Sequence, residues 1–157
     1  DLADRMHSCD VLLDQNLTKK INSRYDELLP DKCIRLLGPT YALLAKEYEP
    51  LHECIPARKG SPQRIMIYFG GADMDNLTGM CIDAFFKCKH SGISLDVVIS
   101  EKSPHKQKIY KQVEKFSNIS VYAGLKSLAP LIAKADLAIG ASGATEAFIL
   151  GRKSYRK

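Results

Sequence analysis

The chain has 157 residues, of which 45% are hydrophobic and 26% charged, a composition typical of a folded globular protein. No apolar run approaches the roughly 20 residues that a membrane-spanning helix needs, so we expect no membrane association. The formal net charge is +5, but residues 152–157 supply four of those charges, and we therefore expect no basic surface for nucleic acid.

The cysteines and histidines predict neither a disulfide framework nor a metal site. The five cysteines are odd in number and form no CxxC pair, so a reducing, cytoplasmic compartment fits them best. Cys81 and Cys88 share one face of a helical pattern and are expected to be small buried thiols. The four histidines lack the spacing of metal ligands, and we expect no metal or other cofactor.

Residues 1–57 are predicted to be the tail of an N-terminal Rossmann-like domain and a connection. Residues 11–14 have the pattern of a strand and residues 41–48 that of a short helix, while prolines interrupt the remainder. A single strand with so little cover cannot bury its own faces, so we expect the beginning of this domain to lie outside the sequence. Asp14, at the end of the strand, is compatible with either a cleft or a turn.

Residues 58–157 are predicted to form a C-terminal nucleotide-binding α/β domain after a linker at 58–62. Short apolar runs alternate with segments in which apolar residues recur every three or four positions. This alternation indicates a parallel sheet covered by helices on both faces, with right-handed crossovers. The strands are expected at 65–69, 95–99, 119–122 and 136–140.

Four helices are expected between and after these strands. The first covers about 77–88, with Asn76 or Thr78 as its N-cap. The second begins with Pro104 as its first helical residue. Its inner face is predicted to consist of Ile109, Val113 and Phe116. The third follows residue 127, and the fourth follows the strand at 136–140.

Two of the predicted strands end in glycines, and ligands of open parallel sheets bind beyond the carboxyl ends of strands. Gly70 and Gly71 follow the first strand, where glycines allow a ligand to approach the backbone or make an ordinary turn. Asp73 and Asp75 come next and are compatible with a catalytic carboxylate pair or with helix capping.

Residues 140–146 have the composition of a phosphate site. A strand that ends in glycines and small hydroxyl residues before a helix brings free N–H groups and the positive end of a helix dipole together. Ser142 and Thr145 can donate hydroxyls, and Glu146 can accept both hydroxyls of a ribose. The segment is neither GxGxxG nor a P-loop, and it is equally compatible with a capped turn.

Seven segments of the chain resemble one family in order and register. The segments are DLADR (1–5), CDVLLDQN (9–16), RY (24–25), LGPTYALL (37–44), YFGGAD (68–73), NLT (76–78) and ADLAIGASGAT (135–145). Through them the chain is similar, over nearly its whole length, to the UDP-2,4-diacetamido-2,4,6-trideoxy-β-L-altropyranose hydrolases of pseudaminic acid biosynthesis, often described as polysaccharide biosynthesis proteins.

The resemblance implies a GT-B-like architecture of two Rossmann-like domains and the hydrolysis, without a metal, of the bond between UDP and an amino sugar. UDP or a UDP-amino sugar is then the expected ligand. By position, the family's diphosphate loop matches Ser142, Gly143, Ala144 and Thr145, and the acid that holds the ribose matches Glu146. The loop beside the uracil base matches Gly124 and Leu125. The glycine loop that lines the cleft matches Gly70, Gly71 and Asp73.

The resemblance also implies a general-base histidine in a Gly-His motif, and this chain contains no Gly-His dipeptide. We therefore expect the base upstream of Asp1 and no catalysis by the chain alone. Two family residues between Thr145 and Glu146 are missing here, and the ending from Arg152 to Lys157 departs from the family. The alternatives are a GT-B glycosyltransferase acting on a UDP-amino sugar and a degenerate protein that only binds a nucleotide or a partner.

Overall fold

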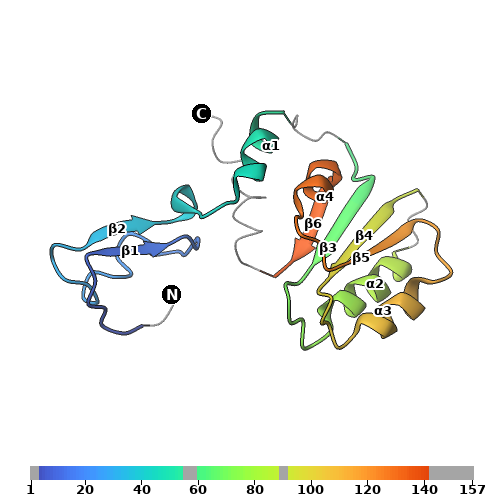
Figure 1. The fold of residues 1–157 in the computed structure, drawn as a ribbon, viewed down its shortest axis with the longest axis horizontal. Coiled ribbons are helices and arrows are strands. Elements are labelled where there is room, and N and C mark those ends of the chain that lie inside the picture. The colour runs from blue at the N-terminus through green and yellow to red at the C-terminus, as the bar shows by residue number, and fades with distance from the viewer. Residues whose placement is uncertain (1–3, 55–59, 89–91, 142–157) are drawn as a thin grey trace. The chain divides into compact units, whose positions relative to one another are not determined.

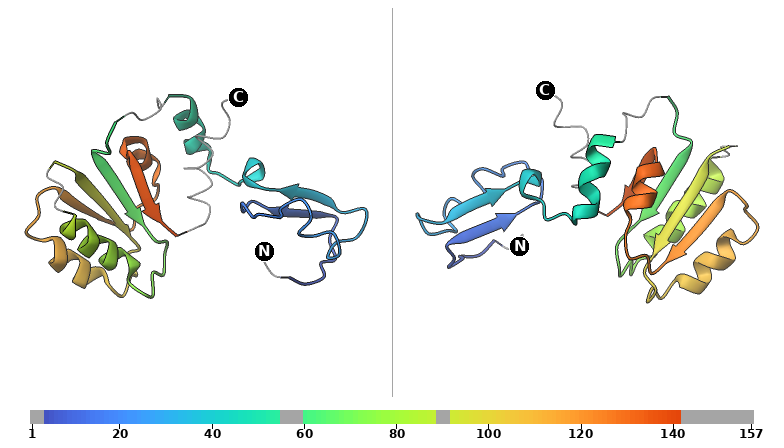
Figure 2. Two further views of the ribbon diagram at one scale, coloured as in Figure 1. Left: turned by 180° about the vertical axis from the view of Figure 1, so that it is seen from behind. Right: turned by 45° about the horizontal axis from the view of Figure 1, so that its top comes forward.

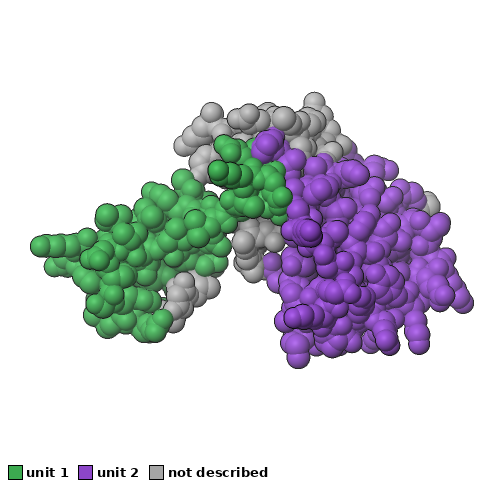
Figure 3. All heavy atoms as spheres, in the orientation of Figure 1, with its two compact units in different colours: residues 1–49, 142–157 green, residues 50–141 purple. Residues whose placement is uncertain are grey.

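The computed structural model describes residues 4–54, 60–88 and 92–141, which divide between two compact units (Figures 1 and 3). Unit 1 contains residues 4–49, and unit 2 contains the described residues from 50 to 141. The domain boundary predicted between residues 57 and 58 falls in 55–59, outside the described residues. No helix among the described residues combines the length and the apolar character needed to cross a membrane.

Unit 1 contains a two-stranded parallel sheet of β1 (Val11–Asp14) and β2 (Ile34–Leu37). The predicted strand at 11–14 is therefore confirmed with the same bounds, but the expectation that it stands alone was wrong, because β2 pairs with it. The side chains of Leu12, Tyr25 and Leu29 pack with Cys33 in a small core, which gives the strand pair the apolar cover that the sequence pattern did not reveal.

The helix predicted over residues 41–48 was also wrong. The chain forms two 3-10 turns, η1 (Pro39–Tyr41) and η2 (Lys46–Tyr48), separated by extended residues. The α-helix α1 (Glu49–Cys54) begins only after them, with Pro50 in its first turn, where a missing N–H group costs little.

Unit 2 is built on a four-stranded, wholly parallel sheet in the order β5-β4-β3-β6. The strands are β3 (Arg64–Tyr68), β4 (Ser94–Ile99), β5 (Ile119–Ala123) and β6 (Leu137–Gly140). The four predicted strands and their parallel direction are therefore confirmed, with boundaries that differ by one residue at most.

Three helices connect these strands and cover both faces of the sheet (Figures 1 and 2). They are α2 (Leu77–Lys87), α3 (Lys106–Val113) and α4 (Ala129–Lys134). The first two crossovers add strands in one direction, so right-handedness places α2 and α3 on the same face. The third crossover returns past β3, which places α4 on the opposite face. The arrangement fits a Rossmann-like fold.

The core of unit 2 lies between the sheet and the two helices α2 and α3. Ile67, Leu95 and Val97 project from the sheet toward Ile82 and Ile109, and all five are essentially inaccessible to solvent. Each buried aliphatic side chain of this kind contributes roughly 1.5–3 kcal/mol. The short apolar runs that predicted the strands therefore supply the sheet side of this core.

Predictions about the edges of the helices were less accurate. Helix α3 begins at Lys106, so Pro104 lies in the preceding turn. The helix ends at Val113, so Phe116 leaves its inner face, is 42% exposed and stacks on Phe86 with ring centroids 4.2 Å apart. Cys88, expected to be buried, follows the last turn of α2 and is exposed.

Candidate functional site

The carboxyl ends of β3 and β6 form the candidate site. These strands are neighbours, with Tyr68 opposite Gly140, yet the chain leaves β3 toward β4 and reaches β6 only by returning from β5. Parallel sheets whose strand order reverses in this way bind ligands in the crevice at the reversal point. The two glycine segments singled out in the sequence therefore begin side by side.

Gly70 and Gly71 leave open space at the end of β3. A Cβ atom placed on either glycine meets no described atom within 4 Å. Gly70 has a φ of +82°, a conformation that other residues rarely adopt, whereas Gly71 has no such restriction. The backbone here is therefore accessible to a ligand, and at Gly71 no packing contact explains the glycine.

Gly124 and Gly140, at the ends of β5 and β6, have structural explanations. Gly124 has a φ of +65°, donates its N–H to the carbonyl of Ile99 at 3.2 Å, and has the Glu101 side chain 3.1 Å from where a Cβ would lie. A Cβ on Gly140 would overlap the main-chain carbonyl oxygen of Tyr68. Both glycines are required by the close approach of neighbouring strands and loops, whether or not a ligand binds.

Asp73 caps helix α2. Its Oδ1 accepts the N–H of Leu77 at 2.8 Å and its Oδ2 that of Thr78 at 3.1 Å, which corrects the predicted caps. Asn76 occupies the N-cap position in a left-handed conformation without a side-chain hydrogen bond. Of the two alternatives left open for Asp73, the structure shows capping, and the first N–H groups of α2 are consequently unavailable to an anion.

The loop after β4 contributes charged residues that the sequence patterns did not single out. Glu101 lies beside Gly124 and forms an ion pair with Lys106 at the start of α3. The Nε2 atom of His105 is 3.1 Å from the carbonyl oxygen of Met74, which joins the loops after β3 and β4. The sequence offered one indication of these residues, which is that they follow a predicted strand and therefore lie at the carboxyl edge of the sheet.

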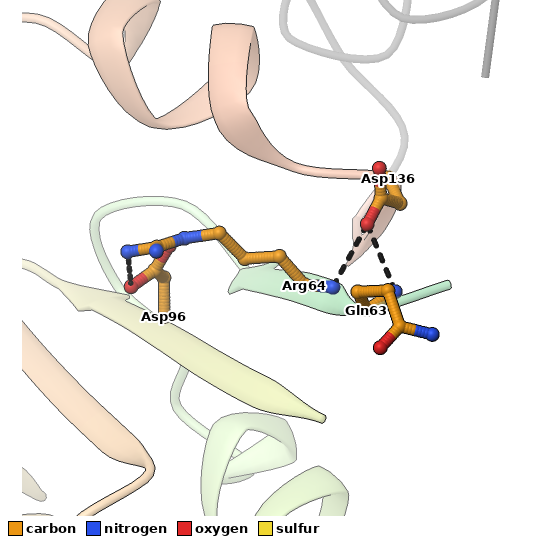
Figure 4. Close-up of polar contacts among 4 residues, drawn as sticks. All are labelled: Gln63, Arg64, Asp96 and Asp136. Carbon is orange, nitrogen blue, oxygen red and sulfur yellow. Dashed lines mark hydrogen bonds and ion pairs between the residues drawn. The ribbon is translucent and has the colours of Figure 1, made fainter. Parts of the chain in front are cut away.

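The opposite edge of the sheet is held by carboxylates (Figure 4). Arg64 donates from Nε and from one terminal nitrogen to the two oxygens of Asp96, at 2.6 and 2.9 Å. These bonds raise the pKa of Arg64, so the guanidinium stays charged. Asp136 accepts the N–H groups of Gln63 and Arg64, both at 2.9 Å, and so joins the starts of β3 and β6.

The carboxylate of Asp14, at the end of β1 in unit 1, is buried and accepts hydrogen bonds from neighbouring residues of its own unit. It is 2% exposed and accepts the Tyr25 hydroxyl at 2.7 Å, the Asn16 N–H at 3.0 Å and the Asn16 side-chain amide at 2.6 Å. Burial opposes ionisation, but the hydrogen bonds from Tyr25 and Asn16 outweigh it and lower the pKa of Asp14. The turn interpretation of Asp14 is the one that the structure supports.

The predicted diphosphate and ribose residues lie outside the described residues. These are Ser142, Gly143, Ala144, Thr145 and Glu146. Leu125, beside Gly124, is described and is 41% exposed. Within 4–54, 60–88 and 92–141, no group of three or more His, Cys, Asp or Glu side chains could hold a metal ion.

No protein-family model matches the chain. The chain is 26% identical over 151 residues to a Campylobacter jejuni protein named UDP-2,4-diacetamido-2,4,6-trideoxy-beta-L-altropyranose hydrolase, covering 96% of this chain and 52% of that protein. It is 25% identical over 151 residues to an uncharacterized protein of Methanocaldococcus jannaschii, covering 90% of this chain and 31% of that protein. The chain therefore spans about half the length of the first relative and just under a third of the second.

Proposed function

We propose that the protein is part of a UDP-sugar hydrolase of GT-B architecture, and that unit 2 binds the UDP moiety of a UDP-linked diacetamido-trideoxy hexose. The Campylobacter jejuni relative, whose name states this activity, aligns with 96% of the chain. In this proposal, unit 2 holds the UDP leaving group. Residues outside these 157 activate the water molecule.

The observation that carries the proposal is the reversal of strand order between β3 and β6. β6 ends in Gly140, Gly70 and Gly71 follow shortly after β3, and Tyr68 and Gly140 lie opposite each other. A nucleotide beyond these strand ends would meet no described side chain where a Cβ of Gly70 or Gly71 would lie.

Asp73 occupies the first amides of α2, so an anion is not expected to bind at that helix start. We therefore assign the phosphate site to the segment after β6, on the basis of its glycines and small hydroxyl residues. In the proposed complex the diphosphate contacts Ser142, Gly143, Ala144 and Thr145, and Glu146 accepts the ribose hydroxyls. A diphosphate needs several N–H groups that converge at a helix start, and a bulky side chain there would block its approach.

Calorimetric titration of UDP tests this assignment. We expect the chain to bind UDP, Gly143→Val to abolish binding, and Gly71→Val to weaken it because its side chain enters the open space. Ser61→Val is the matched control, because Ser61 is exposed at the start of unit 2 and lies before β3. Absence of binding at millimolar UDP, or unchanged binding by Gly143→Val, would contradict the assignment.

Titration of dUDP tests the ribose contact. The nucleotide dUDP lacks only the 2′-hydroxyl, and one hydrogen bond from a hydroxyl to a carboxylate is worth roughly 1.5–3 kcal/mol. Wild type should therefore prefer UDP over dUDP, and Glu146→Ala should remove that preference. Equal binding of the two nucleotides by wild type would show that Glu146 does not hold the ribose.

The activity assignment has its own test. We propose that the general base lies outside these 157 residues, since the chain has no Gly-His dipeptide. The chain alone should then release no UDP from the sugar nucleotide at an enzymatic rate, because general-base catalysis supplies roughly 10²–10⁴-fold. Ordinary turnover by the rigorously purified chain would contradict the placement of the base, while leaving the nucleotide site intact.

A further inference from the structure

Two cysteine thiols of unit 1 lie against each other. The Sγ atoms of Cys9 and Cys33 are 3.7 Å apart, although the residues are 24 positions apart in the chain. Cys33 is 8% exposed and belongs to the core of unit 1, whereas Cys9 packs against that core and is half-buried. Cys9 is therefore the more exposed residue of the pair and Cys33 the more buried one.

The backbone holds the two cysteines close together. Each lies just before a strand of the β1–β2 pair, which is in register from Val11 opposite Ile34. The N–H of Ile34 donates to the carbonyl of Asp10 at 2.8 Å, so the residues that directly follow the two cysteines are hydrogen-bonded to each other. Neighbouring strands lie roughly 4.8 Å apart, which is within the Cα separation that a disulfide spans.

We propose that Cys9 and Cys33 are a thiol–disulfide modification site: on exposure to a low-molecular-weight disulfide they form an intramolecular bond that joins the starts of β1 and β2. The Cys9 thiolate attacks the reagent and releases one thiolate. The Cys33 thiolate then attacks Cys9 Sγ and releases the second. Two protein thiols and one disulfide become one protein disulfide and two small thiols, with the protons passing to the released thiolates.

The surroundings of the pair distinguish this site from a catalytic redox centre. Burial, followed by the neighbouring Cys33 and Asp10, raises the pKa of the Cys9 thiol. Catalytic cysteines have a lowered pKa and react fast. The Cys9–Cys33 bond should therefore form slowly and, once formed, act on stability by constraining the unfolded chain between the two residues.

Mass spectrometry of the oxidised chain tests the proposal. The reduced, folded chain is incubated with oxidised glutathione at about pH 8, alkylated and digested with trypsin. Trypsin separates the Cys9 peptide, 6–19, from the Cys33 peptide, 33–35, so a bond between them is directly detectable. We expect the linked pair to exceed the glutathione adduct of Cys9 by about tenfold, because Cys33 is held beside it.

Three controls make the outcome decisive. Cys33→Ser should accumulate the glutathione adduct on Cys9, while Cys81→Ser should leave the linked pair unchanged. Oxidation should raise the melting temperature of unit 1 in wild type and leave that of Cys33→Ser unaltered. The proposal is overturned if Cys9 keeps its glutathione adduct while Cys33 stays reduced. It is also overturned if exposed Cys88 reacts and neither Cys9 nor Cys33 does, or if the linked yield is no higher than in urea.

Discussion

At the amino edge of the unit 2 sheet, carboxylates hold the Arg64 guanidinium and the backbone amides of Gln63 and Arg64, whereas at the carboxyl edge glycines end β6 and follow β3. Asp96 is 1% exposed and Asp136 joins β3 to β6, so the amino edge is closed by hydrogen bonds. Gly70 and Gly71 leave the other edge open. In the proposed function, the nucleotide binds at the end of the strands opposite to these stabilising contacts, so substitutions should separate stability from ligand binding.

The largest effect is expected at the buried ion pair. Arg64→Met leaves the Asp96 carboxylate buried without its partner. Removing one member of a buried pair costs about 3–5 kcal/mol, and partial exposure of Arg64 places this case at the low end, about 3 kcal/mol. Urea unfolding should show this loss, while UDP affinity stays at the wild-type value because the pair is at the amino edge.

A double substitution controls for the loss of packing. Arg64→Met combined with Asp96→Leu removes both charges, and replacing a buried pair by apolar groups is often neutral. We expect the double variant to recover most of the lost stability. If it is as unstable as the sum of the single variants, the ion pair is not the source of the effect.

Substitution by alanine should affect stability differently at Gly140, which ends β6, and at Gly71, which follows β3. Gly140→Ala would force the new methyl group against the Tyr68 carbonyl, and overpacking of this kind costs roughly 2 kcal/mol. Gly71→Ala meets open space and should change the free energy of unfolding by less than about 0.5 kcal/mol. Thermal unfolding of the two variants measures both changes in stability. Equal losses of stability would contradict the description of this edge of the sheet.

The carboxyl end of β1 offers a contrasting, closed strand end. The lowered pKa of Asp14 means that its contribution to stability is complete above the ordinary value of 3.8 and is lost as pH falls through the lower, folded-state pKa. Tyr25→Phe should cost about 1.5 kcal/mol at neutral pH.

Tyr25→Phe should also bring the pKa of Asp14 closer to its ordinary value, so the variant has less stability to lose in acid. Amide hydrogen exchange of β1 and β2, compared between wild type and variant at neutral pH and at about pH 3, measures this difference. The difference in stability between wild type and Tyr25→Phe should be smaller at about pH 3 than at neutral pH. An unchanged difference would mean that Tyr25 does not stabilise the ionised carboxylate of Asp14.

The smallest effect separates capping from ligand binding at Asp73. Asp73→Ala removes two hydrogen bonds at the start of α2 and should cost about 1 kcal/mol, while Asp75→Ala should cost less than about 0.5 kcal/mol. Asp73→Ser restores a capping oxygen and should recover part of the loss. A large fall in UDP affinity in Asp73→Ser, with stability retained, would show that the carboxylate contacts the ligand as well.

The strands of unit 2 were predictable because their apolar runs are continuous and regularly spaced. Asp96 lies inside one of these runs, and only the structure shows Arg64 as its partner. The cap of α2 was misassigned because Asp73 reaches it from four residues before Leu77, through left-handed residues at 73 and 76. Local patterns do not encode such a path.

The pairing of β1 with β2 could not be predicted for a different reason. Residues 34–37 form a four-residue strand in which Arg35 interrupts the apolar run after its first residue, so no continuous apolar run distinguished it from the surrounding connection. The glycine segments of the candidate site were visible in the sequence, but the sequence did not show that they lie next to each other. They do so because the chain returns from β5 and adds β6 on the other side of β3.

The most direct test of the contrast between the two edges is an NMR titration of the chain with UDP, following backbone amide signals up to about 10 mM ligand. The account predicts that the amides of Gly70, Gly71 and Gly140 shift with increasing UDP, while those of Gln63 and Arg64 do not. Shifts concentrated at the amino edge or in unit 1, or no shift anywhere at this concentration, would contradict it.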